Sequence, residues 1–176
     1  RSKQNGFQPT LVQGNAEGLP FSAGQFEHVN CQGVVHHTPN PSKAMGEIAR
    51  VVKSGGTASV SVYYKNIILR NWSMLRPFSN FAFRLGSKLK GRGREAIYSY
   101  ASVEDIVRTY DGKENPIGFC YDENEFRALI GPDFEVQEIY LHFFPMRSLP
   151  VYLGKTVHRW LDRSVGFMIY ANLKKK

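Results

Sequence analysis

The chain has 176 residues, 42% of them hydrophobic and 22% charged, which is typical of one globular domain with a substantial core. Its net charge of +8 is compatible with an anionic ligand, nucleic acid or an acidic membrane surface and selects none of them. The only cysteines, Cys31 and Cys120, form neither a disulfide framework nor a metal-binding pair. No apolar run approaches the ~20 residues of a membrane span, and we expect a cytoplasmic protein.

The first part of the chain predicts two strands, each followed by a polar turn. Residues 1–9 are polar and indicate a loop. Thr10–Gln13 predicts a short strand, and Asn15–Glu17 then lies just past its carboxyl end. Phe26–Cys31 predicts a second strand, which leads into the turn Gln32–His37. The carboxyl ends of two neighbouring strands would thus present polar residues to one crevice.

A helix and a third strand follow. Asn40 can cap the free N–H groups of a helix whose first residue is Pro41. Helical spacing places Ala44, Met45, Ile48, Ala49 and Val52 on one apolar face, and Gly55–Gly56 is expected to end the helix. Thr57–Tyr64 is a β-branched, alternating strand. Strand, helix and strand with short turns predict a right-handed parallel crossover.

The pattern after Lys65 is less regular. Aromatic and basic residues alternate without clear strand spacing, turn residues interrupt two helical stretches, and two strands close the chain. In order, the predictions are a helical stretch Ile67–Leu89 broken or kinked at Pro77, a loop Gly91–Arg94, a helix over 95–109, a turn over 111–116, a helix capped by Asp122 that runs to Leu129, and strands Phe134–Phe143 and Gly166–Leu173.

Several of these stretches together resemble a known family. They are Gly14-Asn15-Ala16-Glu17-Gly18-Leu19-Pro20-Phe21, Phe26-Glu27, Gln32-Gly33-Val34-Val35-His36-His37 and Val52-Lys53-Ser54-Gly55-Gly56. In this order and at these separations they are similar to class I S-adenosylmethionine-dependent methyltransferases, specifically the type 11 group.

The resemblance implies a fold. It is an α/β, Rossmann-like methyltransferase sheet, mostly parallel with an antiparallel last strand, in which Leu11–Gln13 is the third strand and Val29–Cys31 the fourth. Thr57–Tyr64 would be the fifth strand, and the two closing strands would complete the sheet. The first two strands have no counterpart in this sequence. We expect one partial domain over residues 1–176, with a helical cap or insert at about 65–130.

The resemblance also implies a cofactor, S-adenosyl-L-methionine. The pair that matches Asn15-Ala16 holds the adenine in this family, and the stretch that matches Gln32 to His37 flanks the methionine portion and the reacting methyl. The predicted cofactor-binding residues are Asn15, Ala16, Glu17, Gln32, Gly33, Val34 and His37. Asn15 stands where the family usually has Asp, and its amide oxygen can still accept from an amine.

Methyl transfer requires alignment of donor and acceptor and, for some acceptors, a base. His36 and His37 are the candidate catalytic residues, with His37 preferred; the alternative is that they hydrogen-bond the turn or pack against the cofactor. No metal site is expected, because adjacent histidines cannot easily face one ion. Four aromatic residues could line an acceptor pocket or belong to the core: Tyr64, Trp72, Tyr110 and Tyr121.

The leading hypothesis is methyl transfer to a small-molecule acceptor. Because no Gly-rich turn follows a strand and no acidic residue is available for the ribose, we expect the chain to be inactive alone. The alternative is a non-catalytic basic module, conceivably for nucleic acid, to which the basic run 84–94 would contribute. If strand Val29–Cys31 lacks a neighbour, its exposed edge would favour self-association.

Overall fold

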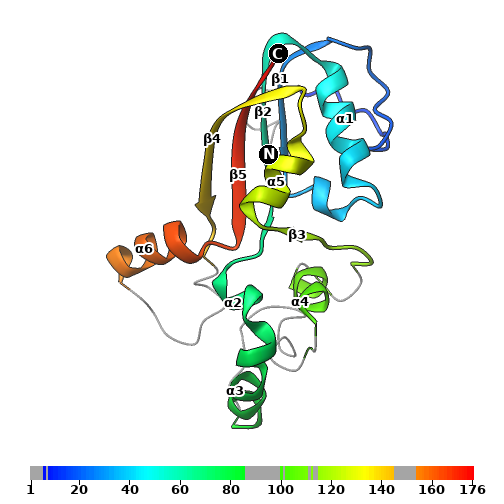
Figure 1. Ribbon diagram of the computed structural model, residues 1–176. Coiled ribbons are helices and arrows are strands. Elements are labelled where there is room, and N and C mark those ends of the chain that lie inside the picture. Colours follow the sequence, from blue (N-terminus) through cyan, green and yellow to red (C-terminus); the bar gives the residue numbers. More distant parts are fainter. Residues whose placement is uncertain are drawn as a thin grey trace.

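The computed structural model describes residues 6, 8–85, 100, 102–110, 112, 115–144 and 154–176, without the side chains of residues 82 and 83 (Figure 1). Its elements, in chain order, are β1 (Phe26–Gln32), a 3₁₀ turn (Val35–His37), α1 (Pro41–Val51), β2 (Val52–Tyr64), α2 (Ile67–Arg70), α3 (Trp72–Arg84), α4 (Val103–Tyr110), β3 (Cys120–Tyr121), α5 (Glu123–Ile130), β4 (Phe134–His142), α6 (Lys155–Val165) and β5 (Met168–Lys175).

The described strands form one mixed sheet in the order β1-β2-β5-β4, with β3 beside the end of β2. Strands β1 and β3 run parallel to β2, whereas β5 runs antiparallel to both β2 and β4. Only β5 is therefore reversed. This confirms the predicted α/β sheet, mostly parallel with an antiparallel last strand.

The start of α1 follows the local signals in the sequence, but its end does not. Asn40 Oδ1 accepts from the backbone N–H of Lys43 at 3.0 Å, and Pro41 is the first helical residue. The prediction that Gly55–Gly56 ends the helix is wrong: Val52 already has extended backbone and begins β2. The two glycines lie inside β2, at the irregularity where Phe26 pairs with Val52 and His28 with Thr57.

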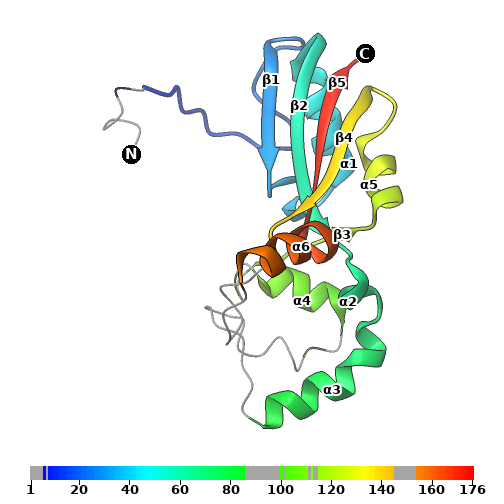
Figure 2. The same ribbon diagram turned by 90° about the vertical axis from the view of Figure 1, so that its left-hand side faces the viewer.

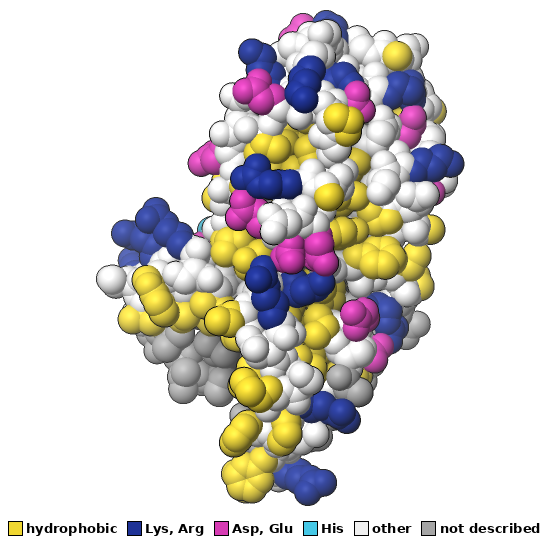
Figure 3. Space-filling view, in the orientation of Figure 1, with side chains coloured by type: hydrophobic (Ala, Val, Ile, Leu, Met, Phe, Trp, Pro, Cys, Tyr) yellow, Lys and Arg dark blue, Asp and Glu magenta, His cyan; other side chains and the backbone are white. Residues whose placement is uncertain are grey.

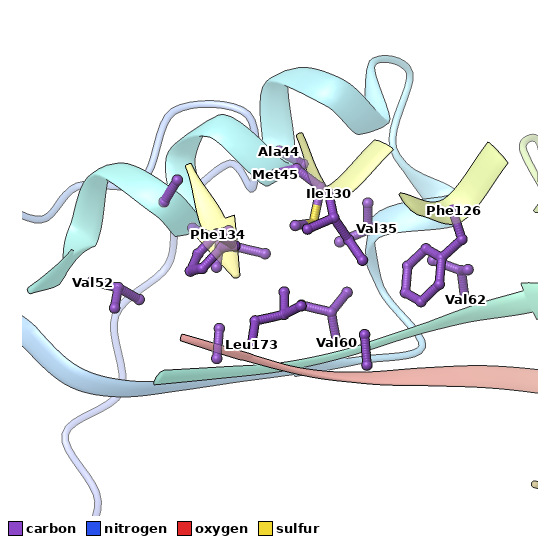
Figure 4. Packing of buried hydrophobic residues seen from close by; sticks show 14 of the residues in the cluster. Val35, Ala44, Met45, Val52, Val60, Val62, Phe126, Ile130, Phe134 and Leu173 are labelled. Carbon is purple, nitrogen blue, oxygen red and sulfur yellow. The ribbon is translucent and has the colours of Figure 1, made fainter. Parts of the chain in front are cut away.

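The main core lies between the sheet and two helices that cover one of its faces, α1 and α5. Figure 4 shows Met45 and Ile130 above Val60 and Leu173, with Phe126 close to Val62. The apolar side chains of α1 recur at helical spacing and those of β2 alternate, so each element turns one face to this core. Asp122 caps α5 in a capping box with Glu125, which confirms the predicted helix start.

The opposite face of the sheet carries polar side chains joined across strands. His28 Nδ1 lies 2.8 Å from Thr57 Oγ1, and Ser59 Oγ donates to Asn172 Oδ1 at 3.0 Å. Figure 2 shows the N-terminal arm projecting beyond the β1 edge of the sheet, away from α5. Strand β1 is the edge of the described sheet on that side.

The prediction that Thr10–Gln13 forms a strand is wrong. Residues 10–14 have no strand assignment, and Leu11 is 87% exposed. The segment forms the arm that projects from the body in Figure 2. A strand needs the hydrogen bonds of a neighbour, and no described strand lies beside this segment to supply them.

Helices α2, α3 and α4 lie beyond the end of the sheet where β1 and β2 terminate (Figures 1 and 2). Pro77 lies inside α3, and the break in this stretch falls at Asn71, between α2 and α3. A second apolar cluster joins this region to the sheet through Tyr63, Trp72 and Phe167. The loop Gly91–Arg94, residues 95–99 and 101 of the expected helix, and residues 111, 113 and 114 of the predicted turn lie outside the described residues.

Helix α6 attaches to the end of β4 through one buried carboxylate. Asp162 is 8% exposed; its Oδ2 pairs with His142 Nδ1, and its Oδ1 accepts from the backbone N–H of Phe144 at 2.7 Å. The predicted closing strands are confirmed as β4 and β5. Among the described residues, no helix is long and apolar enough to cross a membrane.

Candidate functional site

The crevice forms where the carboxyl ends of β1 and β2 meet α2 to α4. In a mostly parallel sheet this edge is where ligands bind. The turn after β1 is held to β2: Gly33 has φ of +72°, and its N–H donates to Ser61 O at 3.2 Å and Ser61 Oγ at 3.1 Å. This positive φ suits glycine and lets the backbone turn sharply over the strand end.

The first predicted turn lies at the same end of the molecule. Asn15 Oδ1 accepts from the N–H of Glu17 at 2.9 Å, so the side chain stabilises its own turn. Glu17 Oε1 then accepts from the N–H of Asn40 at 2.6 Å. Because Asn40 precedes α1, which begins shortly after β1, this contact brings Asn15–Glu17 toward the turn Gln32–His37.

An ion pair on α1 fixes the loop that continues from this turn. Arg50 donates to Glu47, to Phe21 O at 2.8 Å and to Leu19 O at 3.0 Å, and Glu47 Oε2 accepts from the N–H of Leu19 at 2.7 Å. The hydrogen bond from Arg50 lowers the pKa of Glu47 to about 2. The loop is therefore held by backbone contacts to one pair of charges.

Between this loop, β1 and α1 lies an apolar cavity of about 340 Å³. Ala16 and Val34, two of the predicted cofactor-binding residues, line it from opposite turns. The other lining residues include Leu19, Phe21, Phe26, Val29, Cys31, Val35 and Ile48. A flat apolar ring fits such walls, and Asn15 directly precedes the lining residue Ala16 in the chain.

A second cavity of about 220 Å³ lies on the other side of the β1 end. Gln32, Gly33 and His36 line it from the predicted site. The structure adds residues that the sequence did not single out: Ser61, Tyr63, Phe143, Met168 and Tyr170. Of the four proposed acceptor-pocket aromatics, only Tyr110 lines this cavity. The two cavities thus flank the turn Gln32–Val34.

Aromatic rings form most of the wall of the second cavity. The ring centroid of Tyr63 lies 4.1 Å from His36 and 5.0 Å from Phe167, and Tyr110 lies 4.3 Å from Phe167. Tyr170 stacks on Tyr140 at 5.2 Å, and burial raises its pKa. Alternation along β2 could have indicated Ser61 and Tyr63, because they point away from the core positions Val60 and Val62.

The two histidines occupy different environments. His36 is 1% exposed, and its backbone oxygen accepts from the N–H of Phe119 at 3.0 Å. His37 Nδ1 lies 2.7 Å from Ile117 O and 3.0 Å from Asn115 Nδ2. Ile117 O can only accept and Asn115 Nδ2 can only donate, so the two contacts at Nδ1 belong to different tautomers of the His37 ring. Both histidines hold residues 115–119 over the strand ends.

Neither thiol is suited to nucleophilic chemistry. Burial raises the pKa of Cys31 and raises that of Cys120 to about 11. Within the described residues, no three His, Cys, Asp or Glu side chains are grouped so that they could hold a metal ion.

A larger, open groove of about 1140 Å³ lies between β4 and α6. Of the four aromatic residues proposed for an acceptor pocket, only Tyr64 lines this groove. Its other lining residues include His142, Lys155, Arg159 and Asp162. Trp72 instead donates to Tyr100 O within the second apolar cluster, and Tyr121 lines a shallow surface pocket.

Comparison with known sequences gives matches to one enzyme class. A family described as "Methyltransferase domain" matches residues 1–60. The uncharacterized methyltransferase YcgJ of Bacillus subtilis is 43% identical over 44 residues, which are 25% of this chain and 17% of that protein. The ubiquinone/menaquinone biosynthesis C-methyltransferase UbiE of Desulfotalea psychrophila is 34% identical over 94 residues, 50% of this chain and 35% of that protein. The matches thus span about a third or less of these relatives.

Solved structures show the same fold over nearly the whole chain. A putative methyltransferase from Bacillus halodurans superposes with a TM-score of 0.54 at 18% identity, covering 98% of this chain and 74% of that one. A methyltransferase from Thermotoga maritima, titled a possible histamine N-methyltransferase, gives 0.53 at 15% identity, with 99% and 67% covered. At these identities the likeness establishes the fold alone.

Proposed function

We propose that this chain takes part in S-adenosylmethionine-dependent methyl transfer to a small-molecule acceptor, on the premise that its residues 1–60 match the methyltransferase domain family. The observation that carries the proposal is the pair of cavities on either side of the turn Gln32–Val34. One is apolar and is lined by Ala16, which follows Asn15 in the chain; the other is aromatic and is lined by His36. A cofactor that lies across the end of β1 would reach into both cavities.

The residues present fit two ends of the cofactor. Ala16 and Val34 provide apolar walls for an adenine, and Asn15 Oδ1, which already accepts from Glu17, has a second lone pair for an amino group. Gly33 carries no side chain, and a Cβ there would meet nothing within 4 Å, so the backbone is open to close approach. S-adenosylmethionine would supply an electrophilic methyl group on a sulfonium.

The aromatic cavity is the proposed acceptor side. Tyr63 and Tyr110 line it and are buried, and their rings pack edge to face, so this part of the wall is well packed. In-line displacement depends mainly on alignment, which such a wall provides. Its volume of about 220 Å³ suits a small acceptor or one end of a larger one.

The contacts distinguish the roles of the two histidines. His37 is bound to Ile117 O and Asn115, so it fits a positioning role for residues 115–119. His36 lines the cavity itself and is the better candidate for contact with the acceptor. We therefore propose a positioning role for His37 and contact with the acceptor for His36, although the motif alone favours His37 as the catalytic residue.

A titration followed by amide NMR tests the proposal. S-adenosylhomocysteine added to the full 176-residue chain should shift the amides of residues 15–17 and 32–37, with weak affinity because the sequence lacks a Gly-rich turn. Asn15→Ala should reduce these shifts, whereas Glu27→Gln, at an exposed pair with Lys53 outside both cavities, should not. Shifts absent from both turns at saturating ligand would overturn the proposal.

Calorimetry and a mobility-shift assay separate the remaining alternatives. Micromolar affinity for S-adenosylmethionine would contradict the expectation that the chain is incomplete for binding. Retardation of a nucleic acid with steep salt dependence, without shifts at residues 15–17, would instead favour the basic binding module.

A further inference from the structure

Helix α3 exposes a continuous apolar stripe at the end of the molecule remote from the sheet. Met74, Phe78 and Phe81 lie on α3, and Leu85 follows its last residue and donates its N–H to Phe81 O at 3.1 Å. The four residues are spaced by four, three and four positions, so they lie on one side of the helix. Each is 64–73% exposed. We call these four residues the α3 ridge. Figure 3 shows hydrophobic side chains at the surface over α3.

The ridge is not the side on which α3 packs. Trp72 is 7% exposed and joins the second apolar cluster, and Leu75 and Ser79 are half-buried. The helix therefore has a packed side and a separate exposed apolar side. Single exposed apolar residues are ordinary on protein surfaces, but an aligned set of this size marks an interaction surface.

The charged residues of α3 have a single sign. Residues 65–94 contain eight Lys or Arg and no Asp or Glu, and one of the eight, Lys65, is paired with Glu125. Among the described ones, Arg76 and Arg84 lie on α3 itself and are exposed. An apolar stripe whose helix carries only cations matches a surface in which an anionic outer layer covers an apolar interior.

A second helix shows the same combination. On α6, Trp160 is 64% and Val157 is 48% exposed, and Lys155, Arg159 and Arg163 lie on the same helix. Hydrophobic and basic side chains lie at the surface over α6 as well as over α3 in Figure 3. Tryptophan is favoured at the boundary between water and hydrocarbon.

We propose that the α3 ridge binds the surface of an anionic lipid bilayer, with α6 as a second contact. The 13 residues of α3 are too few to cross a bilayer, so the helix would lie in the plane of the interface. Nucleic acid fits the basic residues but makes no use of the aliphatic Met74 and Leu85, which cannot stack on bases. The proposal does not depend on methyl-transfer activity.

Vesicle co-sedimentation tests the proposal on the full chain. We expect binding to phosphatidylcholine vesicles that contain phosphatidylglycerol and little binding to phosphatidylcholine alone. Phe78→Ser with Phe81→Ser should lower the partition coefficient by about tenfold or more. Arg76→Gln with Arg84→Gln should weaken binding to the anionic vesicles only. The matched control, Leu11→Ser with Val12→Ser, removes equally exposed apolar residues from the N-terminal arm and should bind as wild type.

Tryptophan fluorescence provides an independent readout. The chain has two tryptophans, and Trp72 is buried, so a blue shift on adding vesicles reports Trp160. Circular dichroism confirms that the variants are folded. Absence of binding to anionic vesicles, or binding that persists in Phe78→Ser with Phe81→Ser, overturns the proposal. A concentration-dependent oligomer that the same variant abolishes, without vesicle binding, overturns it in favour of a protein contact.

Discussion

The Nδ1 atom of His37 lies 2.7 Å from the backbone oxygen of Ile117, 80 positions later in the chain. With the bond from the N–H of Phe119 to His36 O, it joins the turn after β1 to the segment that enters β3. The side chain of His37 and the backbone carbonyl of His36 therefore hold the segment that forms one side of the crevice.

Replacing His37 by Ala should loosen residues 115–121 without unfolding the sheet. The loss of one half-buried hydrogen bond predicts a decrease of about 1 kcal/mol in the free energy of unfolding. Hydrogen exchange of the Phe119 amide should become faster. His28→Ala, which removes an exposed contact to Thr57, is the control and should leave Phe119 protected. Unchanged protection in His37→Ala would show that the contact does not hold the segment.

Replacing Glu47 by Gln should destabilise the loop over the apolar cavity by about 1–2 kcal/mol at neutral pH, since hydrogen bonds to a charged group are stronger than neutral ones. The pKa of Glu47 is lowered from 4.5 to about 2 in the folded protein. Its contribution is therefore complete above about pH 5 and declines as the pH falls toward 2.

Urea denaturation of wild type and Glu47→Gln at several pH values measures this dependence. The difference in unfolding free energy should shrink between pH 5 and 2. Glu27→Gln serves as the control, because Glu27 pairs with Lys53 and its side chain is 86% exposed. A difference that is independent of pH would contradict the assigned role of the Glu47 charge.

Gly56→Ala should destabilise the protein by about 1–3 kcal/mol. A Cβ at this position would lie 2.8 Å from Glu27 O and 2.9 Å from Lys53 O, both backbone atoms. The irregular start of β2 would have to move. Gly46→Ala is the opposite case, because it lies within α1 with nothing within 4 Å, and it should stabilise by about 0.5–1 kcal/mol. Equal effects in chemical denaturation would contradict the close approach at Gly56.

Asp162→Asn should release α6 from β4. The two carboxylate oxygens accept from His142 and from the Phe144 amide, whereas an Asn side chain has only one acceptor oxygen. We therefore expect the free energy of unfolding to fall by about 1–3 kcal/mol. Limited proteolysis should cut within α6 sooner than in wild type. Asp133→Asn, at an exposed pair with Lys175, should be cut at the wild-type rate. Wild-type proteolysis in Asp162→Asn would show that other contacts hold the helix.

Local signals in the sequence determined the elements that local chemistry controls. Asn40-Pro41 begins α1, Asp122 caps α5, and alternation predicts the second half of β2, because a cap or an alternating pattern involves only neighbours in the chain. The strands β1, β4 and β5 are also expected from the sequence. The order of motifs around Asn15 and Gln32 was likewise enough to indicate the family.

The tertiary structure decided what depends on partners distant in the sequence. Leu11–Gln13 has strand-forming residues, yet it is not a strand, because pairing rather than propensity completes one. Gly55–Gly56 lies in β2 since Val52 already pairs with Phe26. The aromatic cavity brings Tyr63, Tyr110 and Tyr170 together from three separate elements. Such convergence follows from how the elements pack against one another, and no spacing along the chain encodes it.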